Sequence, residues 1–206
     1  MDRPVLSLGA PRVERADAVR NRKHLLVTAR EMLAEQGADK LTMDGLAERA
    51  GLGKGTVFRR FGTRAGIFQA LLDDEERAFQ EQVLAGPPPL GPGAAPLDRL
   101  IAYGRARVGF LFTHREIARA TLDGSQPVPA GSETPLSQLH IRTLLGQLEL
   151  GAADLDILAI QLTAALDGPL LLYLSAADLT EAAAARRTED RIAQGWQDLV
   201  RRACRP

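Results

Sequence analysis

The sequence predicts an all-α protein, with a small helical domain at the N-terminus and a larger helical domain behind it. Three observations support this fold class. Apolar residues recur at spacings of three and four along most of the chain, which is the period of an amphipathic helix. Stretches rich in glycine and proline separate these segments, and no stretch shows sustained strand-type alternation.

Composition is ordinary for a globular protein and excludes several classes. The 206 residues are 45% apolar and 25% charged, enough for one large or two small domains with a real core. No apolar run approaches the roughly 18 residues of a membrane-spanning helix, and the N-terminus lacks a signal-peptide pattern. The single cysteine, Cys204, excludes an internal disulfide. We expect a cytoplasmic protein without a membrane partner.

Charge is balanced overall but unevenly distributed. The net charge is zero, yet residues 1–66 carry +5 and residues 67–206 carry −5. A basic head on an acidic body suits a nucleic-acid-binding module carried by a domain that avoids nucleic acid.

The first elements are an arm and a helix. Residues 1–15 contain prolines and a glycine without helical period, which predicts a flexible arm before a domain at 16–66. Residues 17–36 predict the first helix, because their apolar positions form one stripe. These positions are Leu25, Leu26, Ala29, Met32 and Leu33.

Residues 42–61 predict two short helices joined by a tight turn. Thr42 is a good N-cap for the first helix. Gly51-Leu52-Gly53 then breaks the helix, because glycine can supply the positive φ that turns the chain. The second helix begins at Lys54 and can pack back on the first through Val57, Phe58 and Phe61. Two helices crossing through such a turn form a helix-turn-helix.

The outer face of the second helix is basic. It carries Lys54, Thr56, Arg59 and Arg60, and Gly55 leaves the backbone bare beside them. The first turn of a recognition helix is the part that reaches base edges in the major groove. Short amphipathic helices with a basic outer face are common, so taken without their context these residues are better explained as a solvated face with no role in DNA binding.

The order of residues in this segment resembles the N-terminal domain of the tetracycline-repressor (TetR) family. The matching residues are Thr42, Leu46, Ala47, Ala50, Gly51, Gly55, Thr56, Phe61 and Thr63, with close substitutes at Leu52, Val57, Phe58 and Arg64. The resemblance implies that double-stranded DNA is bound by Thr42, Lys54, Gly55, Thr56, Arg59, Arg60 and Arg64.

Three residues depart from the family pattern. Gly53 replaces a serine and so removes an N-cap hydroxyl, at a typical cost of a few tenths of a kcal/mol. Phe58 replaces a tyrosine whose hydroxyl contacts phosphate in the family. Arg60 replaces a histidine or tyrosine and can supply a stronger phosphate contact. The resemblance therefore implies DNA binding with a different set of contacts.

A long helix is expected from Thr63, its cap, to about Leu84. Arg64 lies in its first turn, where free backbone N–H groups can also hold a phosphate, as in the family pattern. The acidic run at residues 73–76 is expected to be a solvated face, because it lacks a histidine and the convergent spacing of a metal site. Residues 86–96, rich in proline and glycine, predict a linker.

The rest of the chain predicts further helices and one loop, within a regulatory and dimerisation domain at 67–206. Residues 123–135 form the expected loop, and Pro169 is expected to bend the helix that contains it. The expected helices are 97–113, 115–122, 136–150, 154–176 and a last one that begins at 180 or 182 and ends at 203.

Polar and aromatic residues within these apolar helices are candidates for a small-molecule pocket. They are Tyr103, Arg107, His140, Gln161 and Asp167. Each alone is also explained as a surface residue or a satisfied core hydrogen bond. Arg107 would suit an anionic ligand and Asp167 a cationic one, so the ligand class stays open.

We found no catalytic set and expect no enzymatic activity, no cofactor and no metal. The three histidines, His24, His114 and His140, lack a ligand partner at helical metal-site spacing. The glycines at residues 51–55 are not a phosphate cradle, because no strand precedes them.

The resemblance implies a homodimer formed by the last two long helices, and a small-molecule effector bound in the body. We therefore expect a ligand-responsive transcriptional repressor of a pseudo-palindromic operator. One alternative is a DNA-binding protein of the same fold with an architectural or protein-partner role and weak sequence preference. Another is a helical small-molecule carrier or enzyme that does not bind DNA.

Overall fold

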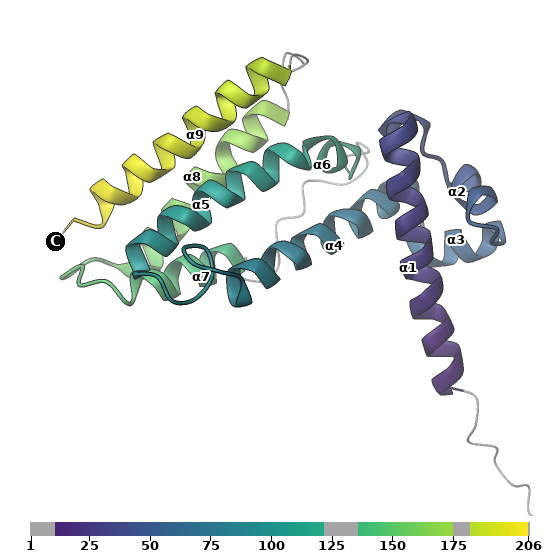
Figure 1. Ribbon diagram of the computed structural model, residues 1–206, viewed down its shortest axis with the longest axis horizontal. Helices are drawn as coiled ribbons and strands as arrows, with labels where there is room; N and C mark the ends of the chain where they lie inside the picture. Colours follow the sequence, from purple (N-terminus) through teal and green to yellow (C-terminus); the bar gives the residue numbers. More distant parts are fainter. Residues whose placement is uncertain (1–10, 122–135, 175–181, 206) are drawn as a thin grey trace, which may run out of the picture. The chain divides into compact units, whose positions relative to one another are not determined.

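A computed structural model describes residues 11–121, 136–174 and 182–205 of the chain (Figure 1). These residues form nine α-helices and one short 3-10 helix, and none of them lies in a strand. The expected all-α fold class is confirmed. Packing divides the chain into two units between Asp73 and Asp74, inside α4 (Arg64–Ala85) and later than the boundary expected at residue 66.

The first unit contains α1 (Pro11–Gln36), η1 (Ala38–Lys40), α2 (Met43–Arg49), α3 (Lys54–Phe61) and the start of α4. α1 packs against η1 and α2, and α2 packs against α3. The apolar stripe predicted for the first helix supplies much of the core. Its least exposed members are Leu25, Leu26, Ala29, Leu41, Leu46, Val57, Ile67, Phe68 and Leu71.

α1 begins at Pro11 and not at Asp17, so the arm predicted for residues 1–15 is wrong at its C-terminal end. Proline is favoured in the first turn of a helix, where its missing N–H has no intrahelical acceptor to lose. The residues that follow include no further proline or glycine before Asp17, and nothing breaks the helix there. Residues 1–10 lie outside the described part of the chain.

The second unit contains the rest of α4 and five further helices. α5 packs against α7, α8 and α9, and α7 packs against α8, so α5 lies at the centre (Figure 1). The helices are α5 (Pro96–Thr113), α6 (Arg115–Thr121), α7 (Leu136–Leu145), α8 (Leu155–Leu174) and α9 (Ala182–Ala203). The predicted linker joins α4 to α5 without helix or strand.

Two boundaries in this unit differ from expectation or stay untested. α7 ends at Leu145, short of the expected residue 150, because the chain leaves the helix at Gly146 and continues in turn hydrogen bonds. α8 is helical through Pro169 to Leu174, and the bend expected there stays a prediction. The loop predicted at 123–135 lies outside the described residues.

α5 and α9 approach closely where a glycine faces a tryptophan. Trp196 of α9 donates its indole N–H to the carbonyl of Leu100, with an N–O distance of 3.1 Å. A Cβ atom on Gly104 would lie 2.0 Å from the same indole ring. Gly104 is therefore required by packing, because any side chain would force the two helices apart.

Candidate functional site

The helix-turn-helix forms as the sequence predicted. The hydroxyl of Thr42 accepts a hydrogen bond from the N–H of Gly45 at 3.0 Å and so caps α2. Gly51 ends α2 with a φ of 64°, a conformation that favours glycine. Gly53 has a φ of −64°, so the turn needs only one of its two glycines for positive φ. Gly53 makes no side-chain cap, as its replacement of serine implied.

α3 has a buried side and an exposed basic side. Val57 and Phe61 face the core, one turn apart. The predicted DNA-binding residues of α3 lie on the other side: Lys54, Gly55, Arg59 and Arg60 are exposed, and Thr56 is half-buried. Phe58 is 50% exposed, so the expectation that it packs on the first helix is wrong. It follows Val57 by about 100° around the helix and falls at the edge of the apolar stripe.

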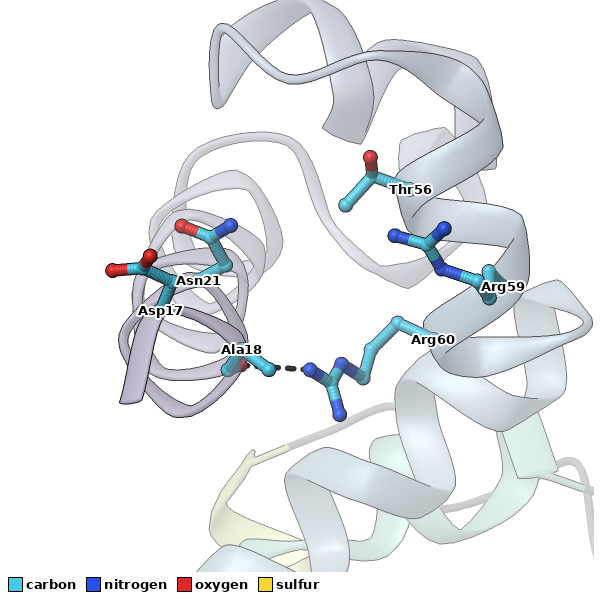
Figure 2. Close-up of a pocket in the computed structure, with 6 residues that line it drawn as sticks. All are labelled: Asp17, Ala18, Asn21, Thr56, Arg59 and Arg60. Carbon is cyan, nitrogen blue, oxygen red and sulfur yellow. Dashed lines mark hydrogen bonds between the residues drawn. The ribbon is translucent and has the colours of Figure 1, made fainter. Parts of the chain in front are cut away.

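A groove of about 550 Å³ separates α1 from α3 on this face of the first unit. Figure 2 shows the Arg59 side chain extending from α3 toward α1, opposite Asn21. Arg60 donates to the carbonyl of Ala18 at 2.7 Å and fixes one helix against the other. The groove is lined by Asp17, Ala18, Asn21, Thr56, Arg59 and Arg60.

Two polar side chains of the groove were missed by the sequence analysis. Asp17 and Asn21 lie four residues apart, so they share one face of α1, and the Asn21 side chain makes no hydrogen bond within the described residues. This spacing on the polar side of a helix next to a helix-turn-helix was the signal that could have identified them. Asparagine is also a residue that can read adenine in the major groove.

Lys54 is paired in the free protein. Its ammonium lies 2.8 Å from a carboxylate oxygen of Asp44 in the first turn of α2, and both side chains are largely exposed. An exposed pair of this kind is worth about 0–1 kcal/mol, so it can exchange for a DNA phosphate or base at small cost. Asp44 lowers the local positive charge at the start of α3.

Arg64 has a structural role that the sequence did not reveal. Its Nε donates to the carbonyl of Leu41 at 2.8 Å, and a terminal nitrogen donates to the carbonyl of Ala38 at 2.6 Å. The guanidinium also lies 4.9 Å from the ring centroid of Phe68. Arg64 thereby fixes the η1 segment to the start of α4. The phosphate contact predicted for it stays a prediction.

Thr63 caps α4, as expected. Its hydroxyl accepts from the N–H of Gly66 at 3.1 Å.

Four of the five predicted pocket residues come together in the second unit. Tyr103 and Arg107 lie one turn apart on α5, and the Tyr103 ring stacks 4.8 Å from that of His140 on α7. Asp167 of α8 lies near enough to Tyr103 for its charge to affect the pKa of the tyrosine. Gln161 is exposed on α8 and joins none of these interactions.

Two members of this polar cluster were missed. Glu76 of α4 accepts from Arg107 at 2.5 Å, so the expectation that residues 73–76 form a solvated face is wrong at Glu76. The two residues are 31 positions apart, and only the tertiary fold pairs them. Arg99 precedes Tyr103 by one helical turn and lies close enough to lower the pKa of His140. The spacing of four in Arg99, Tyr103 and Arg107 was the available signal.

Burial shifts the pKa values of His140, Asp167 and Tyr103 in the direction that favours their neutral forms. Burial, together with the smaller effect of the Arg99 charge, lowers the pKa of His140 to about 4. It raises the pKa of Asp167, against the opposing influence of Arg107. The pKa of Tyr103 is also raised by burial, with the nearby Ser137 and Arg107 opposing the shift.

Several polar atoms of the cluster are buried without a hydrogen bond of ordinary geometry among the described residues. A buried polar atom left without a partner costs about 1–3 kcal/mol, so such a concentration in one place is unusual for a purely structural core. The atoms are Arg99 Nε, Tyr103 Oη, Arg107 Nε and His140 Nε2.

Residues 25–71, which include the helix-turn-helix, match the family described as bacterial regulatory proteins of the tetR family. This part of the chain is a TetR-type N-terminal domain. The match covers most of the first unit, including the capped α2, the turn at Gly51 and the exposed face of α3.

A curated protein that is similar to part of this chain is the DNA-binding transcriptional repressor TetR of Mycobacteroides abscessus. It is 34% identical over 59 residues, which are 29% of this chain and 31% of that protein. The chain thus matches less than a third of that relative's length.

Solved structures are similar in fold to nearly the whole chain, including both of its units. A TetR-family transcriptional regulator from Pectobacterium atrosepticum is 20% identical and has a TM-score of 0.66, with 93% of this chain and 98% of that chain covered. NalD, the secondary repressor of the MexAB-OprM multidrug efflux pump in Pseudomonas aeruginosa, is 18% identical with a TM-score of 0.52, covering 91% of this chain and 97% of that one.

The described residues offer neither a metal site nor a membrane-spanning helix. The described residues contain no group of three or more histidine, cysteine, aspartate or glutamate side chains placed to hold a metal ion. Among the same residues, no helix combines the length and apolar character needed to cross a membrane.

Proposed function

We propose that this chain is a homodimeric, effector-responsive transcriptional repressor that binds a pseudo-palindromic DNA operator in the bacterial cytoplasm. The observation that carries the proposal is the two-sided α3, with Val57 and Phe61 in the core and Lys54, Arg59 and Arg60 exposed on the opposite side. A helix anchored in this way presents its cations to the major groove without losing its own packing.

Residues around α3 supply different kinds of DNA contact. Lys54, Gly55, Thr56 and Arg59 reach base edges or the adjoining backbone from the first turns of α3. Arg60, which already holds α1 through the Ala18 carbonyl, contacts phosphate with its remaining donors. Thr42 and Arg64 contact the backbone from the starts of α2 and α4. The groove residue Asn21 faces the same side as Arg59 and adds a contact from α1.

A dimer doubles this recognition. One short helix reads too few base pairs to select a site, and two related copies read a palindrome. The apolar side chains of Ile157 and Ile160 on α8 and of Leu199 on α9 are 40–50% exposed in a single chain. We propose that these helices pair with their symmetry mates and cover that surface.

The effector binds in the second unit at the polar cluster around Tyr103 and Arg107. α4 carries Arg64 at its start and Glu76 in the cluster, so one continuous helix belongs to both sites. An effector that favours one arrangement of α4 over another changes the affinity of the dimer for DNA. The body is not an enzyme in this proposal, and it needs no cofactor.

The proposal is tested by footprinting and gel shifts on DNA that flanks the gene for this chain. A repressor protects one or a few pseudo-palindromic sites, whereas an architectural protein protects many sites with little preference. A carrier or enzyme protects none. Arg59→Ala is expected to cost about 1–3 kcal/mol of binding at the protected site. Arg77→Ala, which removes an exposed arginine of the second unit, serves as the matched control and should leave binding unchanged.

A further inference from the structure

The face of α5 that looks into the polar cluster is a ladder of hydrogen-bond donors. Arg99, Tyr103 and Arg107 are spaced by four residues, which places them one above the other along the helix. Arg99 Nε and Arg107 Nε are each buried without an acceptor among the described residues, and the buried Tyr103 Oη has Ser137 nearby but makes no hydrogen bond of ordinary geometry with it. Guanidinium nitrogens can only donate, so the ladder calls for a group rich in acceptors.

Formal charge narrows the kind of acceptor. Arg99 and Arg107 contribute two positive charges, and Glu76 neutralises one of them. Arg99 donates to the carbonyl of Val83 at 3.4 Å and makes no ion pair within the described part of the chain. Its guanidinium therefore lacks a counter-ion, which a monoanion would supply.

Aromatic rings surround the donors. The Arg107 guanidinium lies 5.1 Å from the ring centroid of Phe110 and 5.7 Å from that of Phe79. The ring centroids of Tyr103 and Phe79 are 5.9 Å apart, and His140 covers another side of Tyr103. A fully solvated small ion would gain nothing from such walls, whereas an apolar body attached to the anion would pack on them.

We propose that the effector is an apolar monocarboxylate whose carboxylate accepts from the Arg99–Tyr103–Arg107 ladder while its apolar part packs against Phe79 and Phe110. A carboxylate matches the guanidinium fork in shape and carries the single charge that the cluster needs. This inference rests on the proposed effector response, since it names the ligand class of that site.

The test compares probes that differ only in their polar head. Calorimetry on the full-length protein without DNA would measure binding of 4-phenylbutyrate, 4-phenylbutyramide and 4-phenylbutylamine, together with straight-chain carboxylates from hexanoate to dodecanoate. We expect at least one carboxylate to bind, and 4-phenylbutyrate to bind at least tenfold more tightly than its amide or amine. Equal binding of the amide or amine, or no binding by any carboxylate, overturns the proposal.

Variants separate the ladder from a general loss of structure. Tyr103→Phe keeps the ring and removes a buried hydroxyl that makes no hydrogen bond of ordinary geometry, so it should leave thermal stability unchanged or higher while weakening carboxylate binding about tenfold. Arg107→Met should abolish the preference for the carboxylate over the amide. Arg105→Met, which changes an exposed arginine on the same helix, should alter neither. Unchanged carboxylate affinity in both ladder variants refutes the site.

A gel shift with the same probes distinguishes failure of this inference from failure of the proposed function. If carboxylates bind the protein and cause it to release DNA, both the carboxylate site and the proposed effector response are supported. Binding without any change in DNA affinity supports the carboxylate site but contradicts the effector response. A specific DNA shift from a protein that binds no carboxylate leaves the DNA-binding proposal standing and overturns this one.

Discussion

Arg64 combines a structural role with the phosphate contact that we propose for it. Two of its nitrogens donate to the carbonyls of Ala38 and Leu41, while the remaining terminal nitrogen is available to a phosphate at the start of α4. The side chain is half-buried, which limits its freedom and directs that nitrogen.

Arg64→Ala should therefore have two separable effects. Loss of the two carbonyl bonds is expected to lower the free energy of unfolding by about 1–2 kcal/mol, measured by urea denaturation. Loss of the phosphate contact should weaken binding to all DNA sequences and reduce the slope of log K against log salt by about one. Arg64→Lys keeps the positive charge but not the paired carbonyl bonds. It should therefore retain most of the salt dependence of DNA binding while still lowering the free energy of unfolding. A slope equal to that of the parent protein in Arg64→Ala would refute the phosphate contact and leave only the structural role.

Gly55 is the residue at which stability and DNA affinity should move in opposite directions. A Cβ atom at this position would meet nothing within 4 Å in the protein. Gly55→Ala should stabilise α3 by about 0.5–1 kcal/mol, because alanine loses less backbone entropy in a helix. It should weaken operator binding, because the methyl group would stand where DNA approaches the bare backbone. Thermal denaturation and a gel shift measure the two effects.

Glu81→Ala provides the control, because it also places alanine at an exposed helical position but lies on α4 in the second unit. It should leave DNA binding unchanged. If Gly55→Ala binds the operator as tightly as the parent protein, the prediction that DNA closely approaches Gly55 is wrong.

Residue-scale features were predictable from sequence wherever their cause is local. The caps at Thr42 and Thr63 and the helix end at Gly51 depend on neighbours within four residues, and each was predicted. The carbonyl bonds of Arg64 and the Glu76–Arg107 pair join residues 23 to 31 positions apart. No local pattern encodes those pairings, so the structure was needed to find them.

At the scale of elements, the packing of α5 on α9 depends on a single missing side chain. Gly104 lies mid-helix, where glycine normally destabilises by about 1 kcal/mol relative to alanine. Its retention there is explained by the indole of Trp196, which occupies the space of the absent Cβ. Helix boundaries were largely predictable from capping residues and helix breakers. The contact between Gly104 and Trp196 was not, because these residues are 92 positions apart in the sequence.

Gly104→Ala should destabilise the protein despite the better helix propensity of alanine. The clash with Trp196 requires a shift of one helix, which typically costs about 1–3 kcal/mol in a well-packed core. Urea denaturation of the single variants and of Gly104→Ala combined with Trp196→Leu measures the coupling. In the leucine background the substitution should be neutral or stabilising. An equal loss of stability in both backgrounds would show that the indole is not the cause.

At the scale of the whole molecule, the two units correspond to the basic first part and the acidic second part of the sequence. The first unit presents the basic face of α3, and the second contains the donor ladder and the exposed apolar residues of α8 and α9. α4 carries residues of both units, so a change of its position imposed at Glu76 would also be felt at Arg64. In the proposed function, such a movement of α4 changes DNA binding only if two copies of the first unit are held at a defined spacing. The proposed dimer is what would hold them.

Ile160→Glu combined with Ile157→Glu tests that assembly. Both side chains are about half exposed on one face of α8, so a charge there should not disturb the core of a single chain. Buried in a symmetric interface, the two glutamates would meet their copies, and desolvation with like-charge repulsion should drive the dimer apart. Sedimentation should then report the 22.2 kDa chain instead of twice that mass.

Operator affinity should fall at least 100-fold in this double variant, because each monomer reads one half-site alone. Leu84→Glu, which places the same charge on an exposed leucine of α4, should remain dimeric and bind DNA normally. A double variant that stays dimeric would exclude this face of α8 from the interface. One that becomes monomeric yet binds the operator with parental affinity would instead show that a single α3 is sufficient, and the requirement for paired half-sites would be wrong.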